Sequence, residues 1–132
     1  MAGTIKIDFL QTDRGITLTG GARSTPCTSS PGIVNSANTV TVDLNQGNNF
    51  EVTLVGPSTL ANFSNMSAGQ AGHIEIIQDA TGSRTLGYGS QFKFPGNTAP
   101  VASTAANSID ILTYYVASNT EVHINILKGL AR

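Results

Sequence analysis

The feature of this sequence that most constrains its fold is a strict alternation of apolar and polar residues in short runs. The pattern occurs at Ile5–Phe9, Val40–Leu44, Phe50–Leu54 and Val122–Ile126. Alternation with a period of two places every second side chain on one face of an extended chain, and so predicts β-strands with one buried face. Long stretches with a helical period are absent, and the single helical candidate is one short turn within Ser58–Met66.

Turn-forming residues separate the predicted strands. Asn45–Asn49 lies between two alternating runs, which predicts a β-hairpin there. Asp79–Gly82 has the composition of a type I turn closed by a glycine, and it would join Ile74–Gln78 to a returning strand. We therefore assign Asp79, Gly82 and Arg84 a structural role in this turn, in which Arg84 pairs with Asp79 or bonds the turn carbonyls.

The remaining elements complete an all-β prediction. Phe92–Pro100 is proline-rich and predicts an extended crossing with aromatic anchors, and Ser118–Thr120 turns the long apolar run Ile109–Val116 into the last strand. Eight or nine strands in 132 residues are typical of one β-sandwich or jelly-roll-like domain, or of a small barrel.

The N-terminal part of the chain differs from the rest in composition. Gly20–Asn38 is rich in glycine, proline, serine and threonine, so we predict an arm and linker with short strands over residues 1–38 and a β-sandwich body over 39–132. The arm would bind a partner as an added strand. Its partner-binding side chains would be those of four apolar residues, Ile5, Ile7, Phe9 and Leu10. The alternative is that Thr4–Leu10 is an internal strand of the body.

The charge balance excludes several classes of partner. The chain has seven basic and eight acidic residues, a net charge of −1, and only 11% charged residues. Nucleic-acid binding needs clustered Lys and Arg, which are scattered here, and no apolar run is long enough to span a membrane. The lone Cys27 cannot form an internal disulfide and the N-terminus does not resemble a signal peptide, so we expect synthesis in a cytoplasm.

No arrangement of reactive residues points to catalysis, a metal or a cofactor. His123 and Glu121 could share a face of the last strand, and Glu51, Glu75, Asp79 and Asp110 could supply paired carboxylates, but solvated strand positions explain both sets. No serine lies in a nucleophile elbow. Tyr88, Tyr114 and Tyr115 could stack on a sugar, although the last two point to opposite faces of one strand. We expect a protein without enzymatic activity.

The second half of the sequence resembles a known module. The pattern GQxGxIxIxQDxTGSRTLxxGSxFKFPGxTAPxxSTxANxID, which begins at Gly69, is similar to a module of phage and prophage structural proteins. These proteins include tail-fibre-like chains and small virion proteins. The resemblance covers about residues 48–127, and Thr4–Thr12 also resembles the N-termini of small phage virion proteins.

The resemblance implies a role in building a phage particle and implies no reaction. Our first hypothesis is a capsid decoration (cement) protein, present as a homotrimer, that binds the major capsid protein on the outer surface of the virion. The alternative is a tail-fibre or adhesin-tip protein that binds a host-surface glycan. A glycan depolymerase would need paired acids in a groove, for which the sequence offers no clear pair.

Overall fold

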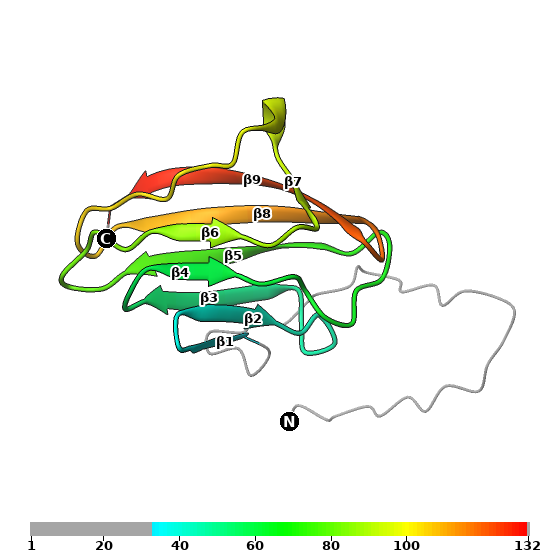
Figure 1. The fold of residues 1–132 in the computed structure, drawn as a ribbon, viewed down its shortest axis with the longest axis horizontal. Helices are drawn as coiled ribbons and strands as arrows, with labels where there is room; N and C mark the ends of the chain where they lie inside the picture. The colour runs from blue at the N-terminus through cyan, green and yellow to red at the C-terminus, as the bar shows by residue number, and fades with distance from the viewer. Residues whose placement is uncertain (1–32, 132) are drawn as a thin grey trace, which may run out of the picture.

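The computed structural model describes residues 33–131, which form two facing β-sheets (Figure 1). The four-stranded sheet runs in the order β1 (Ile33–Ser36), β2 (Thr39–Val42), β4 (Ser58–Leu60), β6 (Leu86–Tyr88). The five-stranded sheet runs in the order β3 (Asn49–Leu54), β5 (Ala71–Gln78), β8 (Ile109–Ser118), β9 (Glu121–Leu130), β7 (Phe92–Lys93). One 3₁₀ turn, Pro95–Asn97, is the only helical element in this range. The predicted all-β fold is confirmed.

Successive strands of the chain alternate between the two sheets. From β2 to β7 each successive strand lies in the opposite sheet, so β2, β4 and β6 are parallel to one another, as are β3 and β5. The β8–β9 hairpin then lies between β5 and β7 in the five-stranded sheet. This alternation brings the apolar faces of mostly short strands from both sheets together around one core.

Two of the three predicted hairpins are wrong. Asn45–Asn49 leads from β2 in one sheet to β3 in the other, and the Asp79–Gly82 turn likewise leads from β5 across to β6. The reason is that alternation fixes only which side chains of a strand face the core. The strand can bury that face either by pairing with the preceding strand in one sheet or by lying opposite it in the other sheet. The predicted β8–β9 hairpin is confirmed.

The expected helical turn in Ser58–Met66 is wrong, because Ser58 and Leu60 alternate into the core as strand β4. The predicted boundary at residue 39 falls between β1 and β2, which pair with each other. The arm predicted over residues 1–38 lies outside the described residues as far as position 32.

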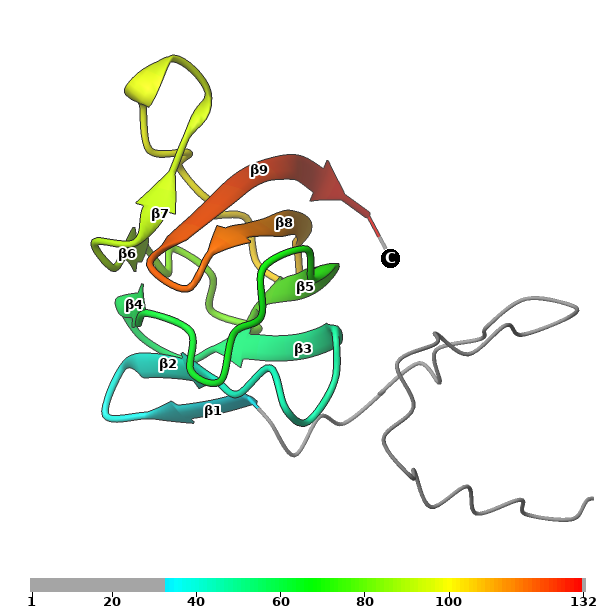
Figure 2. The ribbon, with the colours of Figure 1, turned by 90° about the vertical axis from the view of Figure 1, so that its right-hand side faces the viewer.

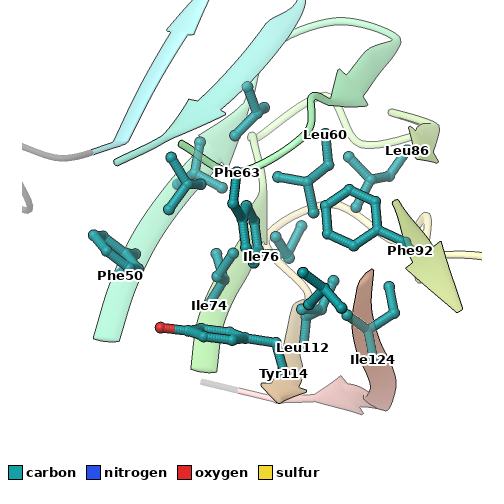
Figure 3. Close-up of a cluster of buried hydrophobic side chains, with 14 of the residues drawn as sticks. Phe50, Leu60, Phe63, Ile74, Ile76, Leu86, Phe92, Leu112, Tyr114 and Ile124 are labelled. Atoms are coloured by element: carbon teal, nitrogen blue, oxygen red, sulfur yellow. The ribbon is translucent and has the colours of Figure 1, made fainter. Parts of the chain in front are cut away.

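The core fills the space between the sheets (Figure 3). Phe63 lies at its centre, with its ring centroid 5.0 Å from that of Phe92 and 5.2 Å from that of Tyr114 in edge-to-face contacts. Burial raises the pKa of Tyr114 to about 12, and its hydroxyl donates to the Asn48 carbonyl at 2.7 Å. Each large apolar side chain removed from water contributes about 1.5–3 kcal/mol, so this core is the main source of stability.

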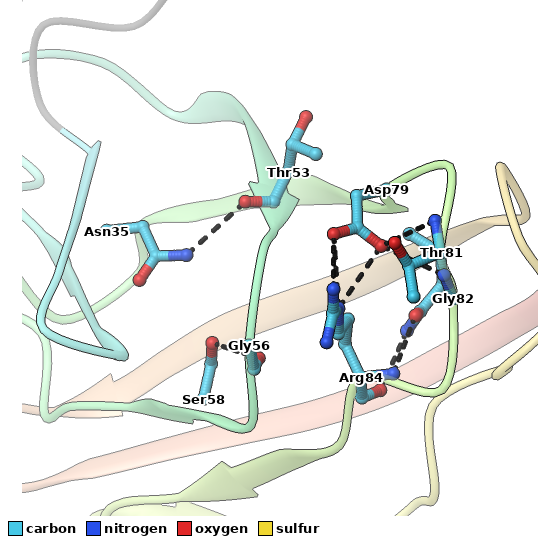
Figure 4. A network of polar contacts seen from close by, with 9 residues as sticks. Asn35, Thr53, Gly56, Ser58, Asp79, Thr81, Gly82 and Arg84 are labelled. Carbon is cyan, nitrogen blue, oxygen red and sulfur yellow. Dashed lines mark hydrogen bonds and ion pairs between the residues drawn. The ribbon is translucent and has the colours of Figure 1, made fainter.

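Side chains hold the turn after β5 (Figure 4). One Asp79 carboxylate oxygen accepts from the backbone N–H groups of Thr81 at 3.1 Å and Gly82 at 2.9 Å. Arg84 donates to both carboxylate oxygens, with its Nη2 2.8 Å from Oδ2, and this hydrogen bonding holds the pKa of Asp79 below its usual value. The buried Gln78 amide bonds the backbone N–H and carbonyl of Arg84 at 2.9 and 2.8 Å. The Asp79 side chain therefore fixes the turn from its start, and the Gln78 side chain fixes its end at Arg84.

A buried carboxylate fastens the chain at the start of β8. Asp110 is 2% exposed, and its two oxygens accept separately from the backbone N–H of Ser103 at 2.6 Å and of Gly129 at 2.8 Å. The β8–β9 register shifts between Ile109 and Ile111, opposite Gly129, whose φ is +70°. Asp110 thus ties the segment before β8 and the end of β9 to a β-bulge.

We expect Gly82→Ala to destabilise the protein much more than Gly96→Ala. Both glycines have positive φ, +69° and +61°, where a side chain costs about 1–2 kcal/mol. A Cβ on Gly82 would in addition lie 2.7 Å from the Ala106 nitrogen and the Thr104 oxygen, whereas one on Gly96 meets nothing within 4 Å. The added crowding should cost about 1–3 kcal/mol. Thermal unfolding measures the difference, and equal melting temperatures would contradict this account.

We also expect Asp110→Asn to destabilise the fold by about 1–3 kcal/mol, because an amide nitrogen would replace one acceptor and leave a buried N–H without a partner. Asp43→Asn is the matched control. A single oxygen of Asp43, Oδ1, accepts from the Asn45 backbone N–H and from the Asn65 side-chain amide. An asparagine at position 43 keeps one such oxygen and therefore both bonds. Urea unfolding of both variants tests this, and equal losses would show that the two oxygens of Asp110 are not both needed.

Candidate functional site

The outer face of the five-stranded sheet carries a row of exposed side chains across three strands. The row runs from Tyr115 on β8 through His123 on β9 to Lys93 on β7, because these residues are register partners. Tyr115 is 49% exposed, and its ring centroid lies 6.2 Å from that of His123 at an interplanar angle of 54°. His123 Nε2 lies 2.7 Å from a carboxylate oxygen of Glu121, which fixes the imidazole. The row presents an aromatic, an imidazole and an ammonium group to solvent.

A second row lies two residues farther along β8 and β9 and continues onto β5. His73 on β5 pairs with Thr113 on β8, which pairs with Asn125 on β9, and all three side chains are exposed. Equivalent positions on one face of a strand are about 7 Å apart, so the second row borders the first. It adds hydroxyl, amide and imidazole groups that can donate or accept hydrogen bonds.

A loop projects from the sandwich beside the first row (Figure 2). It follows β7 and contains the Pro95–Asn97 turn, in which Gly96 and Asn97 have positive φ. Between this loop and β9 is a groove of about 300 Å³. Its lining residues are Lys93, Phe94, Pro95, His123 and Ile124. Since Lys93 and His123 also belong to the first row, the groove continues the exposed face.

A larger groove of about 390 Å³ also borders Phe94, next to the edge of β6. Its lining is mainly apolar: Thr85, Leu86, Gly87, Tyr88, Phe94, Ala99, Pro100, Val101, Ala102 and Thr104. The Tyr88 ring contacts Phe94 at 5.2 Å, and its hydroxyl donates to the Pro100 carbonyl at 3.0 Å. Burial, with a smaller effect of the Asp110 carboxylate, raises the pKa of Tyr88 to about 12.

These surfaces are suited to binding. The outer face combines an exposed ring with several neutral hydrogen-bonding groups, which is the chemistry that orients polar ring-shaped ligands. Within residues 33–131 no three His, Cys, Asp or Glu side chains gather as a metal site. The same range contains no helix long and apolar enough to cross a bilayer.

The sequence-predicted site residues fall in different parts of the protein. Asp79, Gly82 and Arg84 come together in one turn, whereas the arm residues Ile5, Ile7, Phe9 and Leu10 lie outside the described range. Tyr115 is exposed and Tyr114 is buried, as their opposite faces require.

Sequence reasoning missed Lys93, Thr113 and Asn125 as neighbours of Tyr115. The polar positions of the last two strands were a signal, but the partner of each position depends on register.

Comparison with known proteins gives a match to a family model. Residues 31–120, more than half of the chain, match the family model described as "Putative phage tail fibre C-terminal domain". No curated protein and no solved structure matches significantly. The matched range covers β1 to β8 and includes Tyr115, Thr113, Lys93 and His73. The chain therefore belongs to the family of phage tail fibre C-terminal domains and is a structural protein of a bacteriophage particle.

Proposed function

We propose that this protein is a tail-fibre protein that binds a glycan on the host surface through the outer face of its five-stranded sheet. The observation that carries the proposal is the exposed Tyr115 ring beside His123, on a chain whose family is a tail fibre domain. Family membership favours the tail over the capsid shell as the location on the particle.

The physical argument rests on how sugars are bound in water. The apolar face of a sugar ring gains from contact with an aromatic face, and its hydroxyl groups need donors and acceptors to replace water. Tyr115 supplies the aromatic surface, while Thr113 and Asn125 supply neutral polar groups one row away. A row of several strands also suits a chain of sugars, because each unit makes a weak contact and the contacts act together.

The proposed role is binding without hydrolysis. Glycoside hydrolysis needs two carboxyl groups on either side of the scissile bond, with one of them held protonated. Asp79 and Asp110 are committed to Arg84 and to backbone N–H groups. Glu121 beside the first row is held by His123, and Glu51 and Glu75, which are register partners on β3 and β5, lie outside the two rows.

Capsid decoration is a second candidate, with the major capsid protein as partner and a homotrimer as the unit that binds. The alternating residues of Thr4–Leu10 favour it, because an apolar strand with polar neighbours can add to a sheet edge of another protein. Both candidates are virion roles, and they differ in where the protein lies on the particle.

Electron microscopy of particles labelled with an antibody against this protein separates the two candidates. The tail-fibre proposal predicts label on the tail only, at one or a few sites. Label distributed over the head surface would overturn it in favour of decoration.

We expect Tyr115→Ala to weaken glycan binding about tenfold, which corresponds to losing about 1.4 kcal/mol of stacking. Leu127→Ala is the control, since Leu127 is 59% exposed on the same sheet but lies outside the two rows. An array of bacterial surface polysaccharides would identify a binder, and titration calorimetry would give its affinity for each variant. Absence of any binder, or equal losses in both variants, would contradict the proposal.

A further inference from the structure

A free strand edge borders the larger of the two grooves beside the projecting loop. Strand β6 is the last strand of its sheet and pairs only with β4. The Thr85 carbonyl accepts from Ser58 and the Gly89 N–H donates to Leu60, so residues 85, 87 and 89 direct their peptide groups toward β4. The N–H and C=O groups of Leu86 and Tyr88 therefore point away from β4 toward the groove, where no strand of residues 33–131 pairs with β6.

The groove offers apolar contacts as well as backbone groups. Leu86, Tyr88 and Phe94 form one side, and Pro100–Ala102 form the other. Val101 lines the groove and is 71% exposed, so its side chain is accessible to an added segment. A volume of about 390 Å³ lies within the range of binding pockets, about 300–1,000 Å³. Unpaired peptide groups beside an apolar wall are the requirements for adding a strand.

We propose that this edge receives Thr4–Leu10 of a second copy of the chain as an added strand. The segment alternates, so Ile5, Ile7 and Phe9 would lie on one side, toward the apolar lining, with Lys6 and Asp8 toward solvent. The inference goes beyond the proposed function, since it concerns assembly and does not depend on a glycan.

Chain length allows the donor to be a neighbouring copy. The 22 residues at positions 11–32 can span up to about 75 Å when extended. β1 and β6 lie three strand spacings apart, about 14 Å, so this linker far exceeds what the segment needs to reach its own groove and is long enough to reach that of an adjacent copy. One donated segment and one accepting groove per copy form a heterologous contact, which closes into a ring when its rotation permits.

Two of the other open edges are very short or partly satisfied. β7 has only two residues, and on β3 the Thr53 carbonyl accepts from the Asn35 side chain at 3.3 Å. β1, at the opposite edge of the four-stranded sheet, and the outer edge of β9 beyond His123 are longer, so the experiment must distinguish both from β6.

Disulfide trapping in the full chain tests the contact. In a Cys27→Ser background, Ile7→Cys is combined with Val101→Cys in the groove, or with Val55→Cys as the control. Val55 is 62% exposed, similar to Val101, but lies in the loop between β3 and β4. We expect the Val101→Cys combination to form covalent dimers and larger rings at ten times or more the rate of the Val55→Cys combination. An internal disulfide within one chain, equal rates for both combinations, or no cross-link would each overturn the proposal.

Hydrogen exchange of the full chain gives an independent readout. Docking should protect the amides of Leu86 and Tyr88, and the triple change Ile5→Asp, Ile7→Asp and Phe9→Asp should speed their exchange at least tenfold. The amides of Ile76 and Leu112 report whether the variant stays folded. Unchanged protection at β6, or a loss at β9 instead, would overturn the assignment of this edge.

Discussion

Burial of one face of every strand between two sheets is the constraint on which the rest of this structure depends. The strands are mostly short, and none could bury its apolar face by pairing within its own sheet alone. Because the chain crosses to the opposite sheet after almost every strand, Phe50 and Leu60 come from facing sheets yet share one core with Phe63 and Tyr114. The core, in turn, fixes which side of each strand remains outside.

The crossings between sheets expose backbone groups that no ladder satisfies, and polar side chains bond several of them. Gln78 and Asp79 bond the turn that leads to β6, Asp110 bonds the segments before β8 and at the end of β9, and the Tyr114 hydroxyl reaches Asn48 at the start of β3. Such buried bonds contribute modestly to stability when made and cost more when broken. Their effect is to select one path for the chain among several that would bury similar apolar area.

The candidate binding face is a consequence of the same arrangement. Since Val122 and Ile124 point inward, His123 and Asn125 must point outward, and the hairpin register places Tyr115 and Thr113 beside them. β7 adds Lys93 to the edge of this face and starts the loop that borders it. A rigid sheet holding adaptable polar groups, with a projecting loop beside it, is a common way to present a recognition surface.

The amino-acid sequence by itself determined most of the strands, their inward faces and the identity of the turn residues. Alternation at Val40–Leu44 or Phe50–Leu54 is a local property, and Asp79, Gly82 and Arg84 act within six residues of one another. Only the tertiary structure decided that β2 and β3 face each other instead of pairing, that Asp110 is buried, and that Tyr115, His123 and Lys93 form one row. The physical reason is that pairing partners and register depend on contacts between distant residues, and a period-two pattern satisfies several of those arrangements equally well.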